Sequence, residues 1–159
     1  MNGNLPQLGR RGEGWVAPQP VLLAVIAAAG IRGPRWPSSA CSVRTVAATA
    51  SALGGLYLFA GGIKRLGKQI TPFPKPVDQG SVKRSGAYGL VRHPMYGGVL
   101  LLTLAWSLAS SPLALGPWTV AAVFLDAKRR REEAWLVEVH PEYEQYRASV
   151  RDSFVPFVW

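Results

Sequence analysis

The sequence predicts an all-α protein, an integral membrane helical bundle of about four transmembrane helices with a short helical hairpin and a cytoplasmic C-terminal helical segment. Two observations predict this class: the apolar residues gather in blocks without charge, and the basic residues gather between these blocks. The blocks cover residues 21–31, 45–63, 99–109 and 113–125. Blocks so free of charge leave almost no polar face for water, which a soluble helical bundle would need.

The predicted spans are residues 15–32, 44–63, 95–110 and 112–126. The second block is the only one that by itself has the roughly 20 apolar residues needed to cross a bilayer. The first block reaches that length only together with the residues before it. The third and fourth blocks are short, and the sequence Ser110-Ser111-Pro112 separates them. We therefore expect these two blocks to form the hairpin, with its turn near the far interface.

Small residues are frequent in the second block. They are Ala50, Gly54, Gly55, Ala60, Gly61 and Gly62. Small side chains let helices approach each other closely in lipid. We therefore expect the second block to be the central packing helix of the bundle.

The formal net charge is +9, which a nucleic-acid-binding protein could also have, but the positions of the basic residues indicate a membrane topology instead. Seven Lys and Arg residues lie between the second and third blocks, and four more, residues 128–131, follow the fourth. A two-helix hairpin separates these segments, so they share one side, which the positive-inside rule places in the cytoplasm. Arg32, Arg35 and Arg44 after the first block compete with this assignment and leave the first span open. We expect no nucleic-acid partner.

The domain organisation is simple. Residues 1–14 are rich in Gly, Asn and Arg and are expected to be disordered. Residues 15–159 are expected to form one membrane-embedded domain, whose cytoplasmic C-terminal segment covers residues 127–159. Within that segment the pattern predicts an amphipathic helix over 126–139, which His140 and Pro141 end.

The segment 86–98, which reads GAYGLVRHPMYGG, places two aromatic rings, an arginine and the first of two histidines between glycines. The ring of Pro94 biases His93 away from helical dihedral angles, so we expect His93 to be extended and a helix to start at Pro94 or just after it. We call residues 91–96 the elbow. The first amides of a helix have no intrahelical acceptor and favour anions, so the elbow is a candidate binding site.

Three groups of residues are expected to meet at the cytoplasmic face, because each begins or ends a helix on that side. They are Arg92, His93 and Tyr96; Arg129, Glu132 and Glu133; and Tyr143 and Tyr146. Together they offer carboxylates for an ammonium, an arginine for a carboxylate, and rings for a base or a cation. This set matches S-adenosylmethionine. Each group by itself is also compatible with a solvated ion pair or with ordinary packing.

An ordered series of motifs supports this interpretation. Gly-x-Tyr-x-x-x-Arg-His-Pro-x-Tyr-x-Gly covers 86–98, Arg-x-x-Glu-Glu-x-x-Leu ends at Leu136, Glu-Tyr-x-x-Tyr ends at Tyr146, and a proline follows at Pro156. The series resembles the isoprenylcysteine carboxyl methyltransferase family of integral membrane enzymes, including its small bacterial members, over roughly residues 71–156. The related phospholipid methyltransferases share the Glu-Glu pair and the cofactor.

The resemblance implies roles for particular residues. The cofactor-binding residues would be Tyr88, Arg92, His93, Tyr96, Gly98, Glu132, Glu133, Tyr143 and Tyr146. Arg129 and one glutamate of the pair, taken as Glu133, would be catalytic and face the methyl acceptor. The choices between Arg129 and Arg130 and between Glu132 and Glu133 stay open, and His140-Pro141 replaces the Phe-Gly of many relatives.

The expected activity is methyl transfer from S-adenosyl-L-methionine to a lipophilic or lipid-borne acceptor, a carboxylate, at the cytoplasmic face of the cytoplasmic membrane, which is the inner membrane if the source is bacterial. The partners would be this acceptor and membrane lipids. One cysteine, Cys41, without a histidine pair nearby gives no metal-binding pattern, so we expect no metal. The alternatives are a phospholipid N-methyltransferase, an enzyme similar to the NADPH-dependent sterol reductases, and a membrane protein without catalytic activity.

The hairpin makes a topological prediction. Cysteines that replace Lys83 and Arg130 in a Cys41→Ser background should both react with an impermeant thiol reagent added from the cytoplasmic side, because a two-helix hairpin returns the chain to the side it left. Labelling of the two positions from opposite sides would contradict the hairpin.

Overall fold

The structure, a computed structural model, describes residues 6, 8–38, 41–67, 70–71, 73 and 82–159. Part of the tail that the sequence predicts to be disordered, residues 1–5 and 7, lies outside the described residues. The elements are η1 (Glu13–Trp15), α1 (Pro18–Arg32), α2 (Cys41–Leu66), α3 (Ala87–Leu90), α4 (Pro94–Ser110), η4 (Pro112–Ala114), α5 (Leu115–Val139) and α6 (Tyr143–Ser149). The described residues contain no β-strand, so the all-α class is confirmed.

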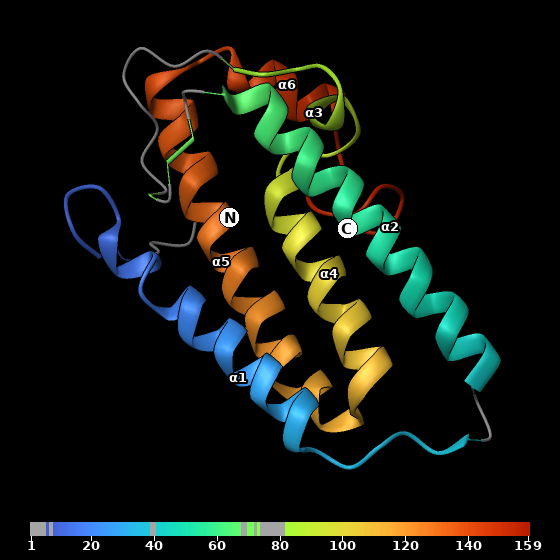
Figure 1. Cartoon of the computed structure of the whole chain (residues 1–159). Coiled ribbons are helices and arrows are strands. Elements are labelled where there is room, and N and C mark those ends of the chain that lie inside the picture. Colours follow the sequence, from blue (N-terminus) through green and yellow to red (C-terminus); the bar gives the residue numbers. More distant parts are fainter. Residues whose placement is uncertain (1–5, 7, 39–40, 68–69, 72, 74–81) are drawn as a thin grey trace.

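Four long helices, α1, α2, α4 and α5, lie side by side, while α3 and α6 gather at one end of them (Figure 1). Helix α4 packs against α2, α1 and α5, whereas α2 packs mainly against α4. The central helix is therefore α4, and the prediction that the second block is central is wrong. The reason is that α4 is itself lined with small buried residues, including Gly97, Gly98, Ala105 and Ser107, while much of α2 is exposed.

The close approach of α2 and α4 depends on glycines in both helices. A Cβ atom at Gly55 would lie 2.9 Å from the backbone nitrogen of Leu102 and 3.0 Å from the carbonyl oxygen of Gly98. A Cβ atom at Gly98 would lie 2.7 Å from the backbone nitrogen of Phe59. Because the neighbouring atoms belong to the backbone, a side chain at either position would force the helices apart.

The segments Glu13–Arg32 and Ser42–Leu66 are long and apolar enough to cross a membrane, and α4 is a shorter apolar helix. Large apolar side chains on α1 and α2 face outward, with exposed fractions of 61% for Val21, 69% for Ile31 and 78% for Val43. An outer surface of this kind is costly in water and favourable in lipid. Length and composition thus indicate a membrane protein.

The bounds of the helices differ from the predicted spans in two places. The first helix begins at Pro18, and Trp15 belongs to the short helix η1 before it. The predicted fourth span and the predicted amphipathic helix are one continuous helix, α5, because no proline or glycine interrupts residues 118–139. Helix α5 ends at Val139, as expected from Pro141.

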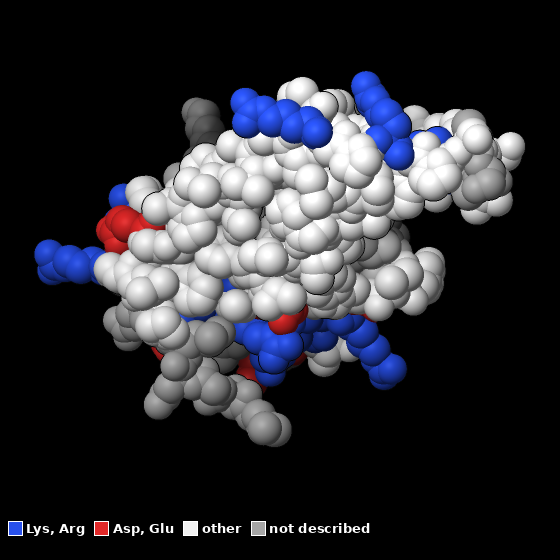
Figure 2. All heavy atoms as spheres, turned by 90° about the horizontal axis from the view of Figure 1, so that it is seen from below, with Lys and Arg blue, Asp and Glu red and all other residues white. Residues whose placement is uncertain are grey.

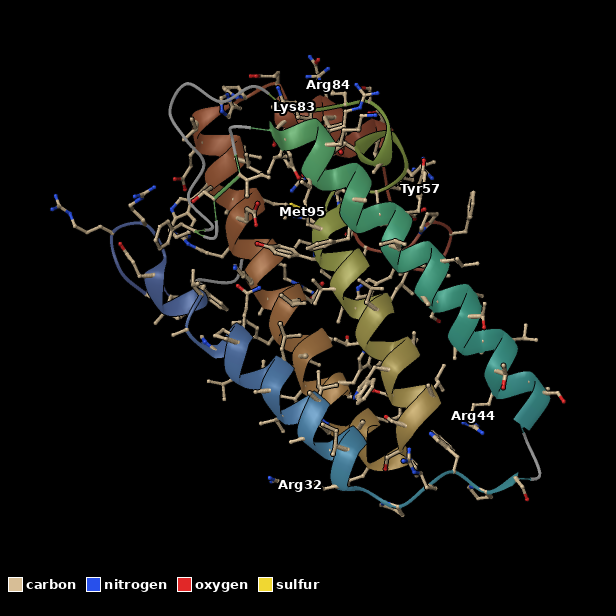
Figure 3. All side chains as sticks on the ribbon, in the orientation of Figure 1. Arg32, Arg44, Tyr57, Lys83, Arg84 and Met95 are labelled. Atoms are coloured by element: carbon tan, nitrogen blue, oxygen red, sulfur yellow. The ribbon has the colours of Figure 1, made fainter. Side chains whose placement is uncertain are left out.

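Basic residues lie at both ends of the bundle. Arg32 and Arg44 are at one end, and Lys83 and Arg84 are at the other (Figure 3). The end with Arg32 and Arg44, which Figure 2 shows from below, has a largely uncharged surface with Lys and Arg side chains toward its edges. Arg44 Nη1 donates to the carbonyl oxygen of Leu108 at 2.8 Å, and Trp36 Nε1 donates to that of Ser107 at 3.0 Å. These bonds attach the connection between α1 and α2 to the end of α4.

Two neighbouring glycines of α2 test the close approach. Gly55→Ala should lower the midpoint of thermal unfolding, because overpacking against a backbone costs about 1–3 kcal/mol. Gly54→Ala is the matched control, since its Cβ atom would meet only Leu101 Cδ1 at an ordinary 3.6 Å. The control should be neutral or raise the midpoint, because alanine is the better helix former. Equal effects of the two variants, measured in detergent, would contradict the proposed contact.

Candidate active site

The backbone of His93 is non-helical, as the sequence predicts, but its dihedral angles lie outside the extended region. His93 precedes α4 with φ −125° and ψ 64°, and Pro94 is the first residue of α4. The backbone amide of Arg92 donates to the carbonyl oxygen of Asp152 at 3.0 Å, and that of His93 donates to Ser153 at 2.8 Å. The segment that follows α6 therefore pairs with the elbow and fixes its backbone.

The guanidinium of Arg92 is engaged by the protein on all three nitrogens, and the residue is buried. Its Nε donates to Glu133 Oε1 at 2.8 Å, and its Nη2 donates to Ser153 Oγ at 2.7 Å. Its Nη1 donates to the carbonyl oxygen of Val150 at 2.8 Å and also to that of Arg151. In this geometry Arg92 joins the elbow, α5 and the segment after α6, rather than pointing a free guanidinium at a ligand.

Glu133 is the central hydrogen-bond acceptor of the side chains that meet here, which we call the cluster around Glu133. Its Oε1 receives Arg92 Nε and lies 3.1 Å from His93 Nε2, and its Oε2 receives Arg129 Nη1 at 3.4 Å. Burial by itself would raise the pKa of the Glu133 carboxyl, but the hydrogen bonds and charges of His93 and Arg92 outweigh burial and lower the pKa to about 2. Glu133 is therefore a buried carboxylate whose two oxygens both have basic partners.

Glu132, the residue directly before Glu133, is in a different environment. It is half-buried, and its Oε2 accepts a hydrogen bond from Tyr96 Oη at 2.7 Å. The ring of Tyr96 is parallel to that of His93, with 5.5 Å between ring centroids, and it meets the ring of Phe154 edge-on. The elbow thus contacts both glutamates: His93 contacts Glu133, and Tyr96 contacts Glu132.

The three predicted tyrosines outside the elbow, Tyr88, Tyr143 and Tyr146, lie in α3 and α6, at the same end of the bundle. Tyr146 Oη donates to the carbonyl oxygen of Tyr88 at 2.6 Å, and the rings of Tyr143 and Tyr146 are 5.4 Å apart. The hydroxyl of Tyr143 is buried and has no hydrogen-bond partner among the described residues. Burial, followed by the charges of Glu133 and Glu132, raises the pKa of Tyr143, so its hydroxyl keeps a proton to donate.

Arg129 and Arg130 are distinguished by the structure. Arg129 Nε and Nη2 donate to Asp126 Oδ1 at 3.0 and 2.5 Å, and Nη1 reaches Glu133. Arg130 donates to Asp126 Oδ2, but its side chain is 64% exposed. Arg129 therefore belongs to the cluster and Arg130 to the surface. Asp126 was not among the predicted site residues, although its spacing of three and four residues from the two arginines indicates both contacts.

Two further residues of the cluster, Ser153 and Phe154, were also missed, because they lie in a segment without a recognisable pattern. Gly98, a predicted cofactor-binding residue, lies against Phe59 and Gly55 of α2 instead of in the cluster. Its neighbour Gly97 faces the carbonyl oxygen of Phe154, so both glycines are required for packing. Within the residues that the structure describes, no three His, Cys, Asp or Glu side chains gather as they would around a metal ion.

Neither a scan against protein-family models nor a search of curated proteins gives a match to this chain. The resemblance to the isoprenylcysteine carboxyl methyltransferase family therefore stays a prediction from the motifs.

The low pKa of Glu133 predicts a pH-dependent contribution to stability. A folded-state pKa of about 2, below the ordinary value of 4.5, stabilises the fold fully above pH 4.5 and progressively less as the pH falls toward 2. We expect Glu133→Gln to lower the thermal midpoint near pH 7 by several degrees, consistent with a linkage contribution of about 3 kcal/mol, and the gap to the parent to narrow below about pH 4.5.

The control for this experiment is Glu138→Gln, at an exposed position of the same helix. Its thermal midpoint should differ little from that of the parent at every pH. A difference in thermal midpoint between the parent and Glu133→Gln that is constant from neutral to acidic pH would show that the contribution of Glu133 to stability is steric and not ionic.

Proposed function

We propose that this protein is an integral membrane methyltransferase that uses S-adenosyl-L-methionine and acts on a lipophilic acceptor, a carboxylate. The observation that supports the proposal most directly is the contact between two motifs about forty residues apart. His93 and Arg92 of the elbow meet Glu133, and Tyr96 meets Glu132. The series of motifs that resembles the isoprenylcysteine carboxyl methyltransferase family is thus consistent with one site.

The proposal includes four spans, formed by α1, α2, α4 and the part of α5 before Asp126. Their side-by-side arrangement and their exposed apolar side chains support it (Figure 1). The cluster around Glu133 lies beyond the apolar part of α5, at the end of the bundle with α3 and α6. On the positive-inside argument this end faces the cytoplasm, where the soluble cofactor is available.

The residues of the cluster fit a zwitterionic cofactor with a cationic amino group. Glu133 already receives three basic side chains, whereas the Glu132 carboxylate, half-buried, receives a neutral phenol. Glu132 is therefore the glutamate suited to the ammonium of the cofactor. The buried hydroxyl of Tyr143, which has no partner among the described residues, offers one further donor to a ligand at the same end.

When bound, S-adenosylmethionine supplies a methyl group on a sulfonium, which passes to an acceptor oxygen and leaves a neutral thioether. The tasks of the protein are to position the acceptor and to exclude water. A carboxylate is already a nucleophile at neutral pH, so no residue needs to act as a base. A phospholipid amine would release a proton that a base must take. The Nε2 atom of His93 already lies within hydrogen-bonding distance of Glu133, so this nitrogen is not free to act as that base.

Titration of the purified protein with S-adenosylmethionine and, separately, with NADPH tests this function against the reductase alternative. We expect saturable binding of S-adenosylmethionine alone. Glu132→Gln should weaken this binding about ten-fold or more, because it removes a charge-assisted hydrogen bond of roughly 1.5–3 kcal/mol.

Glu138→Gln, with an exposed side chain on the same helix, is the matched control and should bind the cofactor like the parent. Unchanged affinity in Glu132→Gln would exclude this glutamate from the ammonium site. Binding of NADPH without binding of S-adenosylmethionine would overturn the proposed function.

A further inference from the structure

Residues 152–159 fold back on themselves, and we call this segment the hook. The backbone oxygen of Trp159 accepts hydrogen bonds from the amides of Ser153 and Phe154, both at 2.7 Å. The ring of Trp159 meets that of Phe154 edge-on, with 5.0 Å between ring centroids. These contacts close the hook into a loop, so the side chains at its tip point in a fixed direction.

The tip of the hook carries two adjacent apolar side chains that the protein leaves exposed. Phe157 is 97% exposed and Val158 is 79% exposed. The backbone of Phe157 has φ 64°, in the left-handed region that a bulky residue rarely adopts. Its amide donates to Asp152 Oδ2 at 2.7 Å, which holds this conformation. A glycine would fit this backbone with less strain, and packing within the chain does not account for the aromatic side chain.

The hook lies at the level where the apolar helix α4 begins. The carbonyl oxygen of Phe154 lies directly against Gly97, the fourth residue of α4. In Figure 1 the C end of the chain is at the height of the first half of this helix. Arg147 and Arg151, which come shortly before the tip, are exposed. An apolar aromatic tip with exposed basic side chains nearby, at the start of an apolar helix, is typical of a segment in the interface of a membrane that contains anionic lipids.

Lipid fits the tip better than a second protein molecule. A stable interface between proteins buries roughly 800 Å² on each partner, far more than two side chains at the tip of a loop can supply. The outer surfaces of α1 and α2 carry large exposed apolar side chains as well, which lipid would also cover.

We propose that the tip of the hook, Phe157 and Val158, inserts into the lipid at the membrane interface on the side of the cluster around Glu133. This contact goes beyond the proposed function, because it requires only that the bundle lies in a membrane and does not depend on the reaction.

The contact also acts on the candidate site. The carbonyl oxygens of residues 152 and 153 accept the backbone amides of Arg92 and His93, so the hook is bonded to the elbow. A tip that is anchored in lipid therefore restrains the segment that holds the elbow in place.

The test uses the full chain in vesicles of phosphatidylcholine and phosphatidylglycerol. A single cysteine, introduced as Val158→Cys in the Cys41→Ser background, is labelled with the fluorophore NBD. Nitroxide groups on the lipid acyl chains quench a fluorophore that enters the hydrocarbon, so we expect strong quenching at position 158. Glu144→Cys, labelled in the same way at an exposed position of α6, is the matched control and should be quenched little.

Phe157→Gly, added to the protein labelled at position 158, separates the aromatic ring from the shape of the hook. Glycine adopts a positive φ without strain, so the hook should keep its shape while the ring is lost. The quenching at position 158 should then fall toward that of the control. The thermal midpoint in detergent should stay unchanged or rise, because a side chain that is 97% exposed contributes little packing. Phe157→Trp should keep the quenching of the parent.

Quenching at position 158 that is no stronger than in the control would overturn the proposal. Quenching that Phe157→Gly leaves unchanged would also overturn it, because the ring would not be the inserted group. If Phe157→Gly does not fold, Phe157→Asn removes the ring with a residue that tolerates a positive φ and answers the same question. A label that is shielded from water but not quenched by the lipid nitroxides would show that protein covers the tip, and would overturn the lipid contact.

Discussion

The buried pair of Arg92 and Glu133 is the interaction on which the organisation of the site depends. Removing two charges from water costs several kcal/mol for each ion, and the cost is offset only when further hydrogen bonds complete both groups. Here Glu133 also has His93 and Arg129 as partners, and Arg92 also donates to the chain that follows α6. The elbow, α5 and this C-terminal segment are therefore held together by one charge cluster.

Small residues also position the start of α4, which carries part of the elbow. Gly55 and Gly98 let the backbones of α2 and α4 approach until no side chain fits between them. At the start of α4, Gly97 allows the carbonyl of Phe154 to lie directly against the helix. Close packing at these glycines and the backbone bonds of Arg92 and His93 to residues 152 and 153 therefore both act on the start of α4.

The two adjacent glutamates have different environments, and this difference organises the candidate site. Glu133 is saturated by basic groups and holds the fold, whereas Glu132 receives a neutral tyrosine and stays half-buried. Tyr96 lies between Glu132 and the ammonium of Lys128, so a carboxylate and a buried cation flank one aromatic ring.

The sequence by itself determined the all-α class, the start of α4 at Pro94, the non-helical backbone of His93 and the end of α5 near Pro141, because periodicity and proline act over a few residues. Only the tertiary structure decided that α4 is central, that Arg92 is occupied by Glu133, Ser153 and carbonyl groups, and that Lys128 is buried. The side-chain hydrogen bonds of Arg92 to Glu133 and of Lys128 to Gln19 join residues that lie 41 and 109 positions apart along the chain. No local sequence pattern predicts which donors are bonded to such distant partners. The sequence therefore indicates which side chains could bind a ligand, and the packing decides which of them are already engaged within the protein.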